Sequence, residues 1–235
     1  MTQNSEAVIK KLPRLKVEHL KQFDPLSDNQ SKAFHAYHKG NNLILSGSAG
    51  TGKTFIAMYL AMREILSKES QYKKIVIIRS IVPTRDIGFL PGDEEEKKEA
   101  YMLPYIDICN ELFTDKMAFK RLQDHGQIEF LSTSFIRGTT LNDAIIILDE
   151  MQNCVFRELD TVITRVGNRA KFIMCGDYYQ SDFDKEKDKN GILDFLQIVN
   201  AMKSFRHIEF TWADIVRSDF VRDYIVTKES LKISS

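Results

Sequence analysis

Residues 43–54 read LILSGSAGTGKT, and this stretch decides the fold of the chain. Gly47 is followed, after four residues, by Gly52, Lys53 and Thr54, which is the phosphate-binding loop pattern G-x-x-x-x-G-K-[ST]. Glycines carry no side chain, so they let backbone N–H groups approach phosphates closely. The pattern predicts a nucleotide-binding loop made of Gly47, Ser48, Ala49, Gly50, Thr51, Gly52, Lys53, Thr54 and Phe55.

The sequence on both sides of the loop supports this prediction. Leu43–Leu45 form a short apolar strand signal, and Thr54–Leu66 is typical of a helix with few polar positions. Phosphates bound by the loop would then lie at a helix N-terminus, where unpaired N–H groups and the helix dipole favour anions. Lys53 would neutralise the outer phosphates, and the Thr54 hydroxyl would hold a magnesium ion.

A second decisive stretch is AIIILDE, residues 144–150. Its unbroken apolar run, Ile145–Leu148, predicts a central strand that ends in two adjacent carboxylates. In phosphate-loop enzymes the first acid, here Asp149, holds the magnesium ion directly or through water. Glu150 is placed to orient and deprotonate an attacking water, which favours hydrolysis over phosphoryl transfer to a bound metabolite.

Two further apolar runs predict buried strands. These are Lys74–Arg79 and Lys171–Cys175, and with the intervening helical patterns they indicate an α/β fold with a doubly wound, mainly parallel sheet. Arg79 lies at the carboxyl end of its strand, the edge where open α/β sheets bind ligands. Gln180 follows the end of the other strand, where its amide could contact the γ-phosphate and report its loss.

Two groups of polar residues allow more than one interpretation. Gln30 lies in the first turn of a helix capped by Ser27 or Asp28, and its amide either pairs with the edge of adenine or faces solvent. Ser132–Ser134 and Arg137 follow a strand signal at Ile128–Leu131, and they are either phosphate contacts or turn formers.

The composition limits the class of protein. The 235 residues carry 33 basic and 33 acidic side chains, so no global positive field draws the chain to nucleic acid or to an acidic membrane. No apolar run approaches the roughly 20 residues that span a bilayer, and the three scattered cysteines indicate neither a zinc site nor a disulfide framework. We expect a cytoplasmic protein without a membrane segment. Residues 1–22 are predicted to be a polar extension, either an arm or a solvated tail, and residues 23–235 a single domain.

Several motifs resemble the PhoH family of phosphate-loop ATPases, which is similar to the first motor domain of superfamily 1 helicases. The matching pieces are GSAGTGKT at 47–54, GFLPGD at 88–93, IRGTTLNDAIIILDEMQN at 136–153, GDYYQSD at 176–182 and IVRSDFV at 215–221. They span about three quarters of the chain in family order. Ser218 stands where the family usually has histidine, and Ser80 where it tends to have proline.

The resemblance implies a single RecA-like P-loop NTPase domain that hydrolyses ATP with Mg²⁺. It implies that Lys53 binds phosphate and that Thr54 and Asp149 bind magnesium. Glu150 would be the base. Gln180 would sense the γ-phosphate, and Arg217 would be the arginine finger, acting within its own chain or on the adjacent one.

We therefore expect an ATPase that depends on single-stranded RNA or DNA, is helicase-like or translocase-like, and forms a homo-oligomeric ring, with a hexamer favoured. Arg79 and Arg137 are the candidate nucleic-acid contacts. The alternative is a nucleotide-dependent switch or assembly ATPase without motor activity. A small-molecule kinase is a third and more distant reading, because Glu150 beside Asp149 favours water as acceptor.

Overall fold

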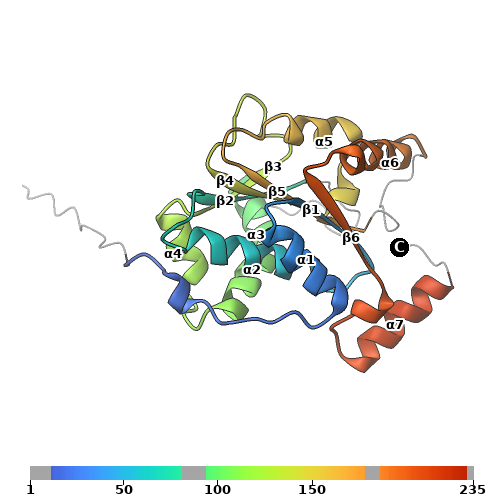
Figure 1. Cartoon of the computed structure of the whole chain (residues 1–235), viewed down its shortest axis with the longest axis horizontal. Coiled ribbons are helices and arrows are strands. Elements are labelled where there is room, and N and C mark those ends of the chain that lie inside the picture. Colours follow the sequence, from blue (N-terminus) through green and yellow to red (C-terminus); the bar gives the residue numbers. More distant parts are fainter. Residues whose placement is uncertain (1–11, 81–93, 178–185, 232–235) are drawn as a thin grey trace, which may run out of the picture.

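A six-stranded, wholly parallel sheet forms the centre of the computed structural model, which describes residues 12–80, 94–177 and 186–231. For 94–98 and 186–190 it describes the backbone only. The strands are β1 (Asn42–Gly47), β2 (Lys74–Arg79), β3 (Ile128–Ser132), β4 (Ala144–Asp149), β5 (Lys171–Gly176) and β6 (Phe205–Phe210). Their order across the sheet is β3-β2-β4-β5-β1-β6 (Figure 1).

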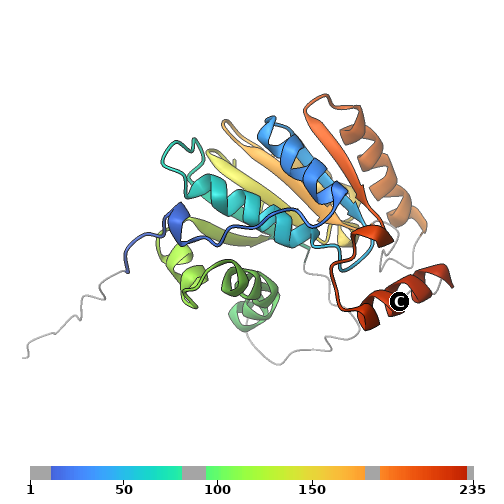
Figure 2. The ribbon, with the colours of Figure 1, turned by 60° about the horizontal axis from the view of Figure 1, so that its bottom comes forward.

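Helices cover both faces of the sheet (Figure 1). One face carries α1 (Asp28–His38), α2 (Lys53–Ile65), α3 (Glu94–Leu112) and α4 (Ala118–Asp124). The other carries α5 (Phe156–Ile163) and α6 (Glu186–Ala201). Figure 2 shows α7 (Asp219–Ser230) apart from both helical layers. The predicted doubly wound α/β fold is therefore confirmed, with every strand pair in the sheet parallel.

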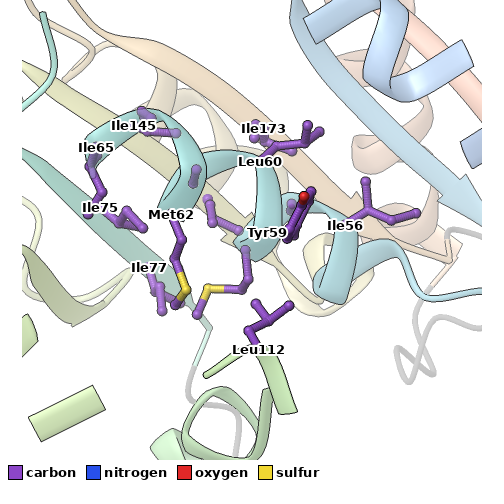
Figure 3. Packing of buried hydrophobic residues seen from close by; sticks show 14 of the residues in the cluster. Ile56, Tyr59, Leu60, Met62, Ile65, Ile75, Ile77, Leu112, Ile145 and Ile173 are labelled. Carbon is purple, nitrogen blue, oxygen red and sulfur yellow. The ribbon is translucent and has the colours of Figure 1, made fainter. Parts of the chain in front are cut away.

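The continuous apolar runs in the sequence reflect burial on both faces of the sheet. In β4, Ile145 and Ile147 pack under α2, whereas Ile146 and Leu148 point to the opposite core. Figure 3 shows the first of these cores, where the apolar side of α2 lies against side chains of β2, β4 and β5. Since neither face meets water, the period-two alternation of a half-exposed strand is absent from β4.

The strand order determines where ligands can bind. β1 and β4 flank β5, so the residues that follow these three strands meet at one edge of the sheet. The chain leaves β1 through α2 and re-enters the sheet at β2, on the far side of β4 and β5. Such a reversal of strand order leaves a crevice at the carboxyl ends of the strands, which is the usual ligand site of open α/β sheets.

The apolar patterns predict a helix over Tyr105–Phe113 and a last strand over His207–Thr211, and both elements begin earlier in the structure. α3 begins at Glu94, in the charged run that precedes this pattern, and it continues through Pro104. The first part of α3 is charged and shows no apolar periodicity, so the pattern marks only its buried second half. β6 begins at Phe205, two residues before His207. The predicted GFLPGD turn at 88–93 lies outside the described residues.

Residues 12–22, the described part of the predicted N-terminal extension, pack against the rest of the described chain. Leu15 is buried, and Leu20 forms an antiparallel bridge with Phe113. The Arg121 guanidinium donates to the Pro13 carbonyl oxygen, with 3.1 Å between Nε and O. Among the helices of the described ranges, none combines the length and the apolar character that crossing a bilayer requires.

Candidate nucleotide-binding site

The phosphate loop joins β1 to α2 and depends on glycine at two points. Gly47 has a φ of 111°, and a Cβ placed there would lie 1.9 Å from the carbonyl oxygen of Phe210 on β6. Gly52 caps α2 in the left-handed conformation, with φ 81° and without a side-chain hydrogen bond to the helix. The N-terminus of α2 therefore offers its first N–H groups at the carboxyl edge of the sheet.

Lys53 lies inside the curve of this loop. Its Nζ donates to the carbonyl oxygens of Gly47 at 2.6 Å and Ser48 at 2.8 Å. Burial lowers the pKa of the Lys53 ammonium, while the negative charges of Asp177, Glu150 and Asp149 act in the opposite direction. The structure thus places a partly desolvated cation between the loop and a group of carboxylates. The binding of phosphate by Lys53 stays a prediction.

Asp149 and Thr54 meet although 95 residues separate them. The Thr54 hydroxyl donates to Asp149 Oδ1 at 2.8 Å, and the carboxylate is buried. Desolvation raises the pKa of Asp149, and the neighbouring Glu150 charge adds to the rise. Both predicted metal ligands supply hard oxygen atoms at one point, so these residues fit a magnesium ion that completes its shell with phosphate and water.

Tyr105 on α3 is a partner of Asp149 that the motifs did not indicate. Its buried hydroxyl donates to Asp149 Oδ2 at 2.9 Å. The only available signal was its place at the start of the apolar half of α3, which does not distinguish it from an ordinary core residue. Together, Tyr105 and Thr54 supply a donor to each oxygen of the buried carboxylate.

Arg79, at the end of β2, faces the same carboxylates. Its guanidinium carbon lies 5.7 Å from the centre of the Tyr101 ring. Burial disfavours the charged form of Arg79, but the acidic groups of Tyr105, Glu150 and Asp149 outweigh burial and raise its pKa. The Arg79 side chain is therefore turned toward the candidate metal site. Its contact with nucleic acid stays a prediction.

Glu150 lies just beyond β4 in an uncommon backbone conformation. Its φ is 51° and its ψ is 46°, the left-handed region that non-glycine residues rarely occupy. The side chain is half-buried and accepts a hydrogen bond from the Gln152 amide. Strained backbone of this kind persists where the surrounding structure holds it and is frequent at functional sites.

Gln30 does not face solvent, which was one of the two interpretations of its amide. The residue is only 1% exposed. Its Oε1 accepts a hydrogen bond from the backbone N–H of Leu26, and its Nε2 donates one to the carbonyl oxygen of Thr51 at 3.2 Å. Gln30 therefore ties α1 to the phosphate loop, and a solvent-facing role is wrong. A contact with adenine stays a prediction, and it would use the second N–H of this amide or displace one of these bonds.

The segment around Arg217 contacts the phosphate loop of its own chain. Val216 donates its backbone N–H to the carbonyl oxygen of Gly50 at 3.1 Å. A Cβ added at Gly50 would come within 2.9 Å of Arg217 Cγ, so the exposed Arg217 side chain lies along the loop. The contact between Ser48 Oγ and Glu229 Oε2 at 2.9 Å, which no motif predicts, joins α7 to the same loop.

Two predicted residues remain, Arg137 and Gln180. Arg137 is exposed in the turn after β3, the edge strand that β2, β4 and β5 separate from β1. Gln180 lies outside the described residues. Within the described ranges, no three histidine, cysteine or acidic side chains form a group that could hold a metal ion.

Comparison with known proteins supports the resemblance seen in the motifs. The family model described as PhoH, PhoH-like protein, matches residues 22–228. The chain belongs to the PhoH family. A PhoH-like protein of Bacillus subtilis (strain 168) is 34% identical over 196 residues, which cover 83% of this chain and 60% of the relative. Protein PhoH2 of the same organism is 39% identical over 144 residues, which cover 60% of this chain and 32% of PhoH2.

This PhoH-family chain spans about 60% of the length of the PhoH-like relatives from Bacillus subtilis and Synechocystis sp.. Among solved structures, it is similar to the large terminase of the thermophilic bacteriophage D6E in complex with ADP. That match has a TM-score of 0.47 and 15% identity, and it covers 85% of this chain and 49% of the terminase. The unliganded Pif1 from Bacteroides sp. matches with a TM-score of 0.40 and 16% identity, over 89% of this chain and 48% of Pif1.

Tyr105→Phe tests the hydroxyl that donates to Asp149. We expect the free energy of unfolding to fall by about 1–3 kcal/mol, because a buried acceptor loses its donor while the ring stays in place. Urea denaturation followed by circular dichroism measures this change.

Tyr37→Phe is the matched control. The Tyr37 hydroxyl is also buried but makes no hydrogen bond within the described part of the chain. Its removal should change the free energy of unfolding by less than about 0.5 kcal/mol or increase it. Equal losses in the two variants would contradict the role given to Tyr105.

Proposed function

We propose that this PhoH-family chain binds and hydrolyses ATP at the carboxyl edge of its sheet. The single observation that carries the proposal is the 2.8 Å contact between Thr54 Oγ1 and Asp149 Oδ1. It brings the end of the phosphate loop to the acid that precedes Glu150. A glycine-rich turn without this function would not need a buried carboxylate as its partner, since burying the charge is costly.

The residues of the site divide the work as follows. The backbone of the phosphate loop and the N-terminus of α2 bind the phosphates, and Lys53 balances their charge. Thr54 and Asp149 would hold magnesium, which when bound offsets negative charge on the phosphate oxygens. Glu150 orients a water molecule and accepts its proton.

Two further residues complete the proposal. Gln180 contacts the γ-phosphate and responds to its loss, as the family resemblance implies. Arg217 stabilises the charge that develops on the transferred phosphoryl group. The packing of Arg217 along Gly50 supports action within its own chain, because the side chain already lies at the phosphate loop.

Lys53→Ala and Glu150→Gln separate binding from turnover. Lys53→Ala should abolish measurable ATP binding, because the cation that faces the phosphates is gone. Glu150→Gln should bind ATP with near wild-type affinity and lose at least about 100-fold in kcat, since the amide cannot accept the proton. A fluorescent ATP analogue measures binding, and phosphate release measures kcat. Wild-type turnover by Glu150→Gln would show that another residue is the base.

We further propose that single-stranded RNA or DNA stimulates the ATPase through the turn after β3. Ile136 is fully buried in this turn, whereas Phe135 is 65% exposed and Arg137 is exposed. The buried side chain fixes the turn, so an aromatic face and a cation are presented outward for a base and a phosphate. Thr133 in the same turn donates its N–H to the carbonyl oxygen of Arg79, which links the turn to the candidate metal site.

Stimulation by single strands is measured as ATPase rate with and without RNA or DNA oligonucleotides at low salt. We expect Phe135→Ala combined with Arg137→Ala to lose the stimulation and to keep the basal rate. Arg206→Ala is the control, because Arg206 is also exposed but lies on β6 at the opposite edge of the sheet.

Absence of both binding and stimulation in the wild-type protein would favour the alternative, a switch or assembly ATPase. That alternative predicts a change of oligomeric state between ATP and ADP.

The proposed assembly is a homo-oligomeric ring, with a hexamer favoured. α7 supports it, since Phe220 is 83% and Tyr224 is 63% exposed on a helix without buried residues. Light scattering after size-exclusion chromatography with ATP should give about six times the 27.2 kDa mass of the chain. Phe220→Glu should reduce that mass, whereas a strict monomer with full activity would exclude a ring.

The cysteines support the proposed cytoplasmic location. Cys109, Cys154 and Cys175 are all buried free thiols. Such side chains pack as small apolar groups and persist in reducing compartments.

A further inference from the structure

Gln152 connects the ends of two neighbouring strands beside the candidate base. It lies in the short 3-10 helix Met151–Asn153, directly after β4 and Glu150, and is 7% exposed. Its Nε2 donates to Glu150 Oε2, and its Oε1 accepts the backbone N–H of Asp177 at 3.0 Å. One amide thus spans the gap between the end of β4 and the residue that follows β5.

The two hydrogen bonds require a side chain with a donor and an acceptor on one rigid group. The reverse orientation of the amide would turn its carbonyl oxygen toward the Glu150 carboxylate and its NH₂ toward the Asp177 N–H, so both contacts would be lost. A carboxylate at position 152 would keep the bond from Asp177 and repel Glu150. The chemistry of the two partners therefore selects glutamine.

Gly176, the last residue of β5, makes room for this arrangement. A Cβ at Gly176 would lie 2.4 Å from Gln152 Oε1 and 2.7 Å from Met151 Cγ. The φ of Gly176 is not in the left-handed region, so glycine is needed here for space and not for backbone conformation. The end of β5 is thus shaped to receive the amide.

We propose that Gln152 is a positioning residue that fixes the Glu150 carboxylate in the direction needed for attack by water. The inference rests on the proposed function, in which Glu150 is the base. Glu150 is half-buried and extends from a left-handed backbone, so the Gln152 donor limits its rotation on the side of β5. A base that is already held in the productive orientation needs no reorganisation before the reaction. Misplacement of a catalytic group by about 1 Å lowers the rate.

Three substitutions separate the two hydrogen bonds. Gln152→Leu removes both, Gln152→Glu keeps only the acceptor for Asp177, and Gln152→Lys keeps only the donor to Glu150. We expect kcat to fall about 10- to 100-fold in the Leu and Glu variants and clearly less in the Lys variant, which restores a donor to Glu150. Affinity for a fluorescent ATP analogue should stay within about 2-fold in all three. Gln127→Leu is the control, because it removes another amide, just before β3, and should change neither quantity.

Hydrogen exchange of the Asp177 amide gives a readout that does not depend on turnover. Exchange should accelerate in the Leu and Lys variants and stay slow in the Glu variant, because only the last retains the acceptor. Equal losses of kcat in all three variants, or losses of kcat that follow the exchange rate of the Asp177 amide, would overturn the proposal and leave Gln152 a structural residue. If Glu150→Gln loses turnover while Gln152→Leu and Gln152→Glu keep it, only the role of Gln152 is wrong. If Glu150→Gln keeps turnover, the proposed base fails and this inference fails with it.

Discussion

The hydrogen bond from Thr54 to Asp149 is the constraint on which the rest of the site depends. It forms only if β1 and β4 are parallel, lie in one sheet and end at the same level, with β5 between them. A buried carboxylate tolerates little loss of its donors, because an unpaired charge away from water costs several kcal/mol. The apolar strands provide the rigid frame, and the polar contact determines which ends of that frame must coincide.

The buried charges near this bond do not serve the stability of the fold. Lys53 faces Asp177, Glu150 and Asp149, and Arg79 faces Glu150 and Asp149. Burial disfavours the charged form of the lysine, the arginine and Asp149 alike. Replacing such a group by apolar residues of similar volume would commonly be neutral or stabilising for a protein. A fold that keeps these charges together retains an arrangement that suits an anion and a hard cation, at the expense of some free energy of folding.

Local sequence patterns predicted those parts of the site that consist of consecutive residues. They predicted the phosphate loop, the acids Asp149 and Glu150, and the buried strands. Backbone conformation and burial on two faces each give a short, recognisable pattern of residues. The contact of Tyr105 with Asp149 could not be predicted, because it depends on which core residue of α3 faces Asp149 in the folded chain. The contacts of Gln30 and Glu229 were missed for the same reason, as they join segments that only the tertiary fold brings together. The charged run at 93–99 indicated a solvated helix start, but it could not show that α3 continues into the apolar half, because a charged helix has no apolar period.

The contacts around the phosphate loop explain how its backbone can be ready for an anion. The carbonyl oxygen of Gly50 accepts from the Val216 N–H, and that of Thr51 accepts from Gln30 Nε2. Because a trans peptide is planar, fixing these two carbonyls toward the protein points the N–H groups of the following residues, Thr51 and Gly52, to the opposite side. Neighbouring segments therefore determine the direction of the loop's donors before any phosphate arrives. This preorganisation avoids a cost that a flexible glycine-rich turn would meet at each binding event, and it gives the segments before β1 and after β6 a direct effect on the site.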